Sequence, residues 1–131
     1  MEKKLERLLA NLSPEMKQGD YVFCTSKELP ANINLMDIRC FFKEKEGYSM
    51  VIQKEIAEEH NLDFDLITSW IELGVYSSLS AIGLTARVAN ALTEEGISCN
   101  CIAAYHHDHL FIDKESAPCA LDILQRLSKQ N

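Results

Sequence analysis

The stretch SSLSAIGLTARVANALTEEGISCNCIAAYHHDHLFID, from Ser77 to Asp113, contains the pattern on which the fold depends. A polar loop ends near Gly83, and apolar residues then recur at helical spacing up to Gly96, which suits the residue after a helix end. Two strand-like runs follow, at residues 97–105 and 109–113, separated by a polar turn at residues 106–108. The stretch therefore predicts a loop, a helix and a β-hairpin.

Elements of the same kinds extend on both sides of this stretch. Before it, LITSWIELGVYSS (residues 66–78) predicts a long strand, and after it an amphipathic pattern predicts a helix over residues 116–128, capped by Ser116. In the first half, a strand at residues 21–25, a hairpin at 38–53 and a short helix at 54–60 follow in a similar order. The first crossover of that half has only a weak pattern.

The order β-α-β-β-α-β is the ferredoxin-like arrangement, an antiparallel sheet with its helices on one face. We therefore predict an α+β protein of two ferredoxin-like units in tandem, the first over residues 1–66 and the second over residues 67–131. Units of roughly 65 residues bury little surface alone, so we expect the halves to share a core or to continue each other's sheet.

Composition restricts the classes of partner. The formal net charge is −7 and no basic block offsets it, which argues against a nucleic-acid partner. No apolar run approaches the roughly 18–20 residues that cross a bilayer, so no membrane segment is expected. The N-terminus reads as an amphipathic helix and not as a signal peptide, and five cysteines then indicate reduced thiols in the cytoplasm.

The second half resembles the ACT domain, a small ligand-binding regulatory module of amino-acid metabolism. The matching features are the loop SAIGL (residues 80–84), the turn at Gly96 and Ile97, and Asn100 in the strand that follows. The whole chain resembles the small bacterial tandem-ACT proteins of uncharacterised function, through GDYVFCT (residues 19–25) and FFKEKEGYSMVI (residues 41–52). Ile82 is a departure, because many ACT loops have proline there.

The resemblance implies that the protein binds a small molecule, commonly an amino acid at an interface between ACT units, without catalysis and as a homo-oligomer such as a dimer. Physical reasoning indicates the same place, because the first turn of a helix leaves backbone N–H groups that attract a carboxylate. We expect Asn100 and strand carbonyls to hold the ammonium group. The expected ligand-binding residues are Ser78, Ser80, Ala81, Ile82, Gly83, Leu84, Thr85 and Asn100.

A purely structural interpretation of the same residues remains open. Ser80 would cap the helix, Gly83 would only permit the turn, and Asn100 would bond a neighbouring strand. If the ligand interpretation holds, a Gly83→Val variant should stay folded and lose binding.

The cysteines and histidines between Cys99 and His109 suggest a zinc site, but their spacing is poor for one. In a strand, residues two apart lie about 6.6 Å from each other. Two zinc-bound sulfurs lie within about 4.6 Å of each other, because each is about 2.3 Å from the metal. We therefore predict no metal, no other cofactor and no catalytic residue, with Cys99 and Cys101 packed under a helix.

The predicted function is that of a cytoplasmic regulatory or sensor protein that binds a small molecule, with an amino acid expected, and is not an enzyme. The alternative is a ligand-free dimerisation or interaction module of ACT type that docks onto a metabolic enzyme. The two differ in whether amino acids stabilise the fold.

Overall fold

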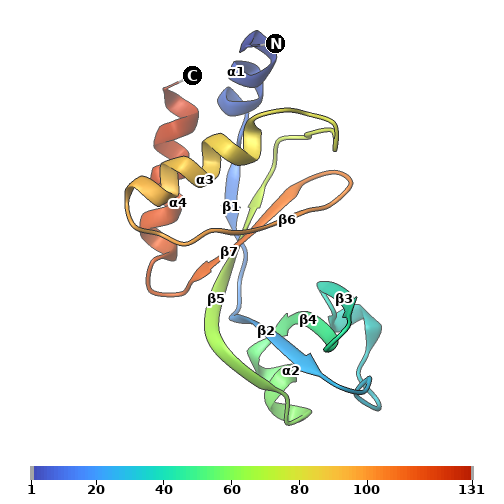
Figure 1. Ribbon diagram of the computed structural model, residues 1–131. Coiled ribbons are helices and arrows are strands. Elements are labelled where there is room, and N and C mark those ends of the chain that lie inside the picture. Colours follow the sequence, from blue (N-terminus) through green and yellow to red (C-terminus); the bar gives the residue numbers. More distant parts are fainter. Residues whose placement is uncertain (1, 131) are drawn as a thin grey trace. The chain divides into compact units, whose positions relative to one another are not determined.

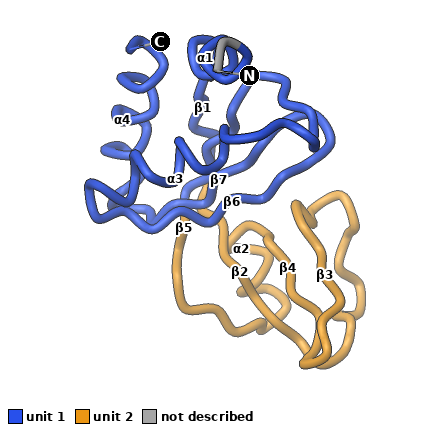
Figure 2. Tube along the Cα trace, turned by 45° about the horizontal axis from the view of Figure 1, so that its top comes forward, with its two compact units in different colours: residues 1–18, 69–131 blue, residues 19–68 orange. Residues whose placement is uncertain are grey.

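The computed structural model describes residues 2–130, and these form two compact units (Figure 2). One unit is continuous, from Gly19 to Thr68, and is called the inserted unit here. The other combines the residues up to Gln18 with those from Ser69 onward, and is called the split unit. The chain thus begins in the split unit, passes through the inserted unit and returns.

The inserted unit contains four strands and one α-helix (Figure 1). Its elements are β2 (Tyr21–Ser26), the 3-10 helix η1 (Leu35–Asp37), β3 (Cys40–Glu44), β4 (Gly47–Gln53), α2 (Lys54–Glu59) and the first part of β5 (Asp63–Leu73). The strand order is β3-β4-β2-β5, with antiparallel pairing of β3 to β4, β4 to β2 and β2 to β5. Its core joins the strands to α2, through Val22, Cys24, Met50, Ile52 and Ala57.

The split unit contains the rest of β5 and three helices. Its other elements are α1 (Glu2–Ala10), β1 (Pro14–Met16), α3 (Leu84–Glu94), β6 (Asn100–Ala103), β7 (Asp108–Asp113) and α4 (Ala117–Lys129). The strand order is β1-β5-β7-β6, with β1 antiparallel to β5 and β6 antiparallel to β7. The fourth strand of this ferredoxin-like unit is therefore β1, which comes from the start of the chain.

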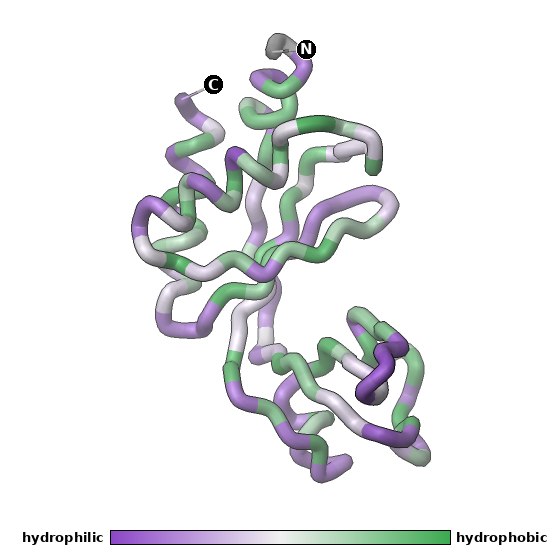
Figure 3. The backbone as a smooth tube through the Cα atoms, viewed as in Figure 1, coloured by the Kyte–Doolittle hydropathy of each residue, from purple (hydrophilic) through white to green (hydrophobic). Residues whose placement is uncertain are grey.

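All three helices of the split unit pack into one core. Alternate strand residues such as Ile71 and Leu73, and Leu110 and Ile112, face this core together with the apolar stripes of the helices. Along α4, hydrophobic and hydrophilic residues alternate as expected for a helix with one buried face (Figure 3). Burial of these stripes fixes α3 and α4 on the same face of the sheet.

The predicted fold class is confirmed: the protein is α+β, with two ferredoxin-like units whose helices pack against antiparallel sheets. The weak first crossover of the first half is η1 and its flanking loops instead of an α-helix. The stop at Gly96 is also as expected, with φ of 73° and an Ile97 N–H to Leu92 carbonyl bond of 3.0 Å.

Several details differ from the sequence-based expectations. Packing does not follow chain order, because α1 and β1 bury their apolar side chains with α3 and α4. The predicted boundary between two sequence repeats, at residues 66/67, stays a prediction. The strand expected to reach residue 78 ends at Leu73, where the Gly74 and Val75 N–H groups bond instead to the carbonyls of Ser13 and Leu12. Ser116 precedes α4 without a side-chain capping bond.

Candidate functional site

A pocket of about 130 Å³ lies in the split unit, where the loop after β5 enters α3. Its walls come from three places: the loop, the first turn of α3 and the β6–β7 hairpin. The lining residues are Ser77, Ser78, Leu79, Ala81, Gly83, Leu84, Thr85, Ala86, Ala103 and Asp108. This α3 pocket is therefore built around a helix N-terminus.

The first turn of α3 begins at Gly83 without a side-chain cap. Gly83 has φ of 99°, a left-handed conformation that favours glycine, and its carbonyl accepts the Arg87 N–H at 3.0 Å. The amides of the first turn carry partial positive charge and have no intrahelical acceptor. The pocket thus contains a helix end suited to a carboxylate or another small anion.

Gly83 also has a packing role. A Cβ at this position would lie 3.1 Å from Leu5 Cδ2 of α1. A valine would combine this crowding with a backbone conformation that β-branched residues rarely adopt. The expectation that Gly83→Val stays folded is therefore unsound, and that variant cannot serve as a specific test of binding.

The loop before α3 is held by the hydroxyl of Ser78. This oxygen lies 2.8 Å from Ser80 Oγ and accepts the Ser80 N–H at 3.1 Å, while the Ser78 carbonyl accepts the Ala81 N–H at 2.9 Å. Ser80 consequently bonds within the loop and does not cap α3. Both serines are exposed, so their hydroxyls can also meet a ligand.

Asp108 provides the one carboxylate among the residues that line the α3 pocket. It is the first residue of β7, and only 8% of its surface is exposed. Burial raises the pKa of its carboxyl group, and the neighbouring His109 and His107 oppose this rise. From the sequence, Asp108 is expected only in a polar turn, because the local pattern does not indicate that the turn folds back onto α3.

Thr85 and Cys101 interact at the edge of the same pocket. The Thr85 side chain hydrogen-bonds the Cys101 sulfur, but burial is the stronger influence, and Asp108 adds to it. Burial, Asp108 and Cys99 together raise the pKa of the Cys101 thiol to about 12, and the contact with Thr85 opposes this rise. Cys101 is therefore a neutral thiol at neutral pH, and its thiolate is not available for chemistry.

Most of the expected ligand-binding residues meet at the α3 pocket. Ser78, Ala81, Gly83, Leu84 and Thr85 line it, whereas Ser80, Ile82 and Asn100 do not. The Asn100 amide donates to the Phe111 carbonyl at 3.2 Å, across the β6–β7 hairpin. This bond agrees with the purely structural interpretation of Asn100, in which its side chain bonds a neighbouring strand.

The cysteines and histidines of the hairpin point to different surroundings. Cys99 and Cys101 pack against the core of the split unit. His109 Nδ1 accepts a hydrogen bond from Trp70 Nε1 at 3.0 Å, and burial lowers its pKa, so its ring is neutral. His107 Nδ1 lies 3.3 Å from the Val75 carbonyl. Within residues 2–130, no three Cys, His, Asp or Glu side chains are arranged to hold a metal ion.

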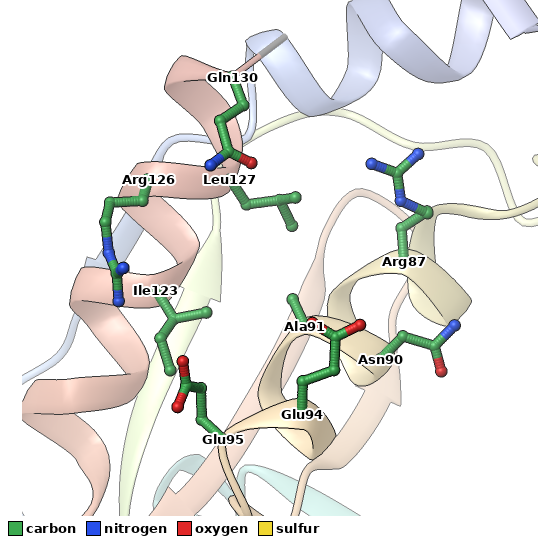
Figure 4. A pocket seen from close by; sticks show the side chains of 9 residues that line it. All are labelled: Arg87, Asn90, Ala91, Glu94, Glu95, Ile123, Arg126, Leu127 and Gln130. Atoms are coloured by element: carbon green, nitrogen blue, oxygen red, sulfur yellow. The ribbon is translucent and has the colours of Figure 1, made fainter.

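A larger cavity, of about 360 Å³, lies between α3 and α4 (Figure 4). Its floor is apolar, and charged side chains of both signs surround it; the lining residues are Arg87, Asn90, Ala91, Glu94, Glu95, Ile123, Arg126, Leu127 and Gln130. The charged groups are exposed, and Arg126 already pairs with Asp122 at 3.1 Å. This cavity is the larger of the two, but the α3 pocket contains a helix N-terminus and the carboxylate of Asp108. We therefore regard the α3 pocket as the better candidate for a ligand-binding site.

Comparison with protein families decides the relationship. The model of the ACT domain matches the chain twice, over residues 1–69 and over residues 66–126. The chain belongs to the ACT domain family. The resemblance stated from the sequence is thus confirmed, and the α3 pocket lies in the second ACT match.

Solved structures place this ACT protein among similar folds. A Vibrio cholerae protein of unknown function, described as a possible transport protein, is 42% identical, with a TM-score of 0.85 over 96% of this chain and 97% of that one. An Agrobacterium tumefaciens protein is 16% identical, with a TM-score of 0.72 over 88% and 87% of the chains.

The ligand-free regulatory subunit of aspartate kinase from Thermus thermophilus has a TM-score of 0.64 at 9% identity, over 89% of this chain and 97% of that one. This likeness shows a shared fold alone. A comparison with curated proteins gave no match. None of the helices that the structure describes is both long and apolar enough to span a membrane.

Proposed function

We propose that the protein is a regulatory or sensor protein that binds an amino acid in the α3 pocket and has no catalytic activity. The observation that carries the proposal is the uncapped N-terminus of α3 in a pocket lined by the predicted loop residues. Membership of the ACT domain family, whose domains are regulatory modules, supports the same role.

The carboxylate of the ligand would meet the amides of Leu84, Thr85 and Ala86 at the start of α3. Such amides already point along the helix axis and need no rearrangement to bind an anion. The hydroxyl of Ser78 would add a donor from the loop. In this arrangement the loop recognises the part that all α-amino acids share, and the side chain of the ligand decides selectivity elsewhere.

The state of the thiols supports a non-catalytic role. Burial raises the pKa of Cys24, Cys99 and Cys101, which disfavours the nucleophilic thiolate at each. His109 bonds to Trp70, and His107 lies beside a backbone carbonyl, instead of either pairing with a thiol. All five cysteines are free, which suits a reducing compartment such as the cytoplasm, and we propose that location.

A second candidate function is a ligand-free interaction module. The observation that favours it is β3, an edge strand of the inserted unit that exposes Phe42 (67%) and Phe41 (42%). Such an edge can add a strand from another chain, either a second copy or an enzyme partner. A homo-oligomer formed through an edge strand is compatible with both functions.

A thermal-shift screen of the twenty amino acids at millimolar concentration separates the two functions. A ligand at about 100 times its dissociation constant adds roughly 2.7 kcal/mol of stability. The sensor function predicts a selective rise of the melting temperature for one amino acid or a few. A flat panel, together with a dimer in light scattering that Phe42→Ser dissociates, would instead establish the interaction module. Wells with zinc and with a chelator test the metal prediction.

A further inference from the structure

Asp108 is a buried residue, and no hydrogen bond from another described residue to its carboxylate is found. Because no buried side-chain oxygen of the described residues lacks a partner, the carboxylate oxygens of Asp108 remain open to the α3 pocket that the residue lines. Its backbone pairs with Ala103 across the hairpin, and the two flanking histidines are the nearby groups that oppose the rise of its pKa. Cys101 on the neighbouring strand is also near, but its thiol is neutral. A carboxylate on a residue that is only 8% exposed normally has a charged or hydrogen-bonding partner, and the open side of Asp108 is the α3 pocket.

The surroundings of Asp108 indicate the kind of partner that is missing. Its side chain lines the α3 pocket, as do Gly83 and Thr85 at the start of α3. The pocket therefore presents a positive helix end and a negative carboxylate within one small space. A molecule with an anionic and a cationic group on adjacent atoms would satisfy both, and a simple anion or a simple cation would satisfy only one.

The size of the α3 pocket limits the molecule further. A cavity of about 150 Å³ is large enough for benzene, which has six heavy atoms. The pocket of about 130 Å³ therefore has room for roughly the same number. Glycine, L-alanine and L-serine have about five to seven heavy atoms and lie within this range, whereas long side chains must leave the pocket at its mouth.

We infer that Asp108 accepts the ammonium group of the ligand, and that the α3 pocket selects small zwitterionic α-amino acids such as glycine, L-alanine and L-serine. The inference rests on the proposed function and adds the residue that reads the amine. It replaces Asn100, whose amide is already bonded to Phe111. Asp108 is thus a specificity residue for a free amine at this site.

Titration calorimetry with L-alanine and propionate tests this assignment. Propionate has the same carboxylate and methyl group but no amine. L-Alanine should bind the wild-type chain at least tenfold more tightly than propionate, because a hydrogen bond to a charged group contributes about that factor or more. The Asp108→Asn variant should lose most of this preference, while the matched Asp65→Asn variant, an exposed aspartate of the inserted unit, should keep it.

Each outcome decides the question. Equal affinities for L-alanine and propionate in the wild-type chain would overturn the inference without any variant, so a folding defect of Asp108→Asn cannot obscure the result. Unchanged L-alanine binding by a folded Asp108→Asn protein would overturn it too, and would leave the proposed function standing. The absence of binding by glycine, L-alanine and L-serine would refute the assignment. If the larger amino acids do not bind either, the proposed function is refuted as well.

Discussion

Alanine at each of the two glycines that flank α3 tests how the site is built. Gly83 precedes the helix with φ of 99°, and Gly96 follows it with φ of 73°. In the left-handed region a Cβ approaches the following carbonyl oxygen, which costs about 1–2 kcal/mol. Both Gly83→Ala and Gly96→Ala should therefore lower the free energy of unfolding by about this amount.

The two positions differ in the space for the new methyl group. At Gly96 nothing lies within 4 Å of an added Cβ, whereas at Gly83 the Leu5 Cδ2 atom lies at 3.1 Å. Leu5 is half-buried and its methyl group ends a flexible side chain, so it can yield by a few tenths of an ångström. We expect this adjustment to add about 1 kcal/mol, the lower end of the usual cost of overpacking.

Urea denaturation of the wild-type chain and the two variants measures the difference. Gly83→Ala should unfold at a lower midpoint than Gly96→Ala, with unchanged slopes. A Leu5→Ala/Gly83→Ala double variant should recover about 1 kcal/mol of coupling energy in a double-mutant cycle. Equal midpoints for the two single variants, or no coupling to Leu5, would refute the claim that α1 packs on the loop at Gly83.

Three further predictions concern charge, thiols and the core. Burial raises the pKa of Asp108 above its unfolded value of about 3.9, so ionisation of this carboxyl group destabilises the native state as the pH rises. In thermal melts, Asp108→Asn should therefore gain stability relative to the wild type between acidic and neutral pH. A difference that stays constant with pH would contradict this. At pH 8, mass spectrometry should find Cys119, which is exposed, alkylated much faster than Cys101, and equal rates would be inconsistent with the buried thiol. Leu124→Ala in the core should cost about 2–5 kcal/mol in chemical denaturation, whereas Leu79→Ala on the exposed loop should change stability by less than about 0.5 kcal/mol.

Much of the fold was predictable because local patterns and packing agree in this chain. The apolar stripe from Leu84 to Leu92 and the stop at Gly96 define α3, and the stripe is buried as expected. The packing of α1 and β1 with the second half was not predictable in the same way. An amphipathic helix has one apolar face, but its sequence does not specify which sheet that face covers.

The candidate site, too, could be predicted from the sequence only where a residue's role depends on its local pattern. Gly83 and Thr85 were found because a glycine before a helix has a local meaning. Asp108 lies 23 residues further on in a run of polar residues, and only the pairing of β6 with β7 brings it to the start of α3. Asn100 failed to reach the pocket for a related reason, since its amide is engaged in the hairpin that positions Asp108.

The most direct test of the account is a titration of the ¹⁵N-labelled chain with L-alanine and then with each of the other amino acids, followed by amide chemical shifts. The proposed function places the ligand carboxylate on the first-turn amides, so the signals of Leu84, Thr85 and Ala86 should move most, with Asp108 beside them. Shifts centred instead on Arg87, Asn90 and the end of α4 would place the ligand in the groove between α3 and α4. Either that result, or no shift for any amino acid, would contradict the central claim that the α3 pocket is the binding site.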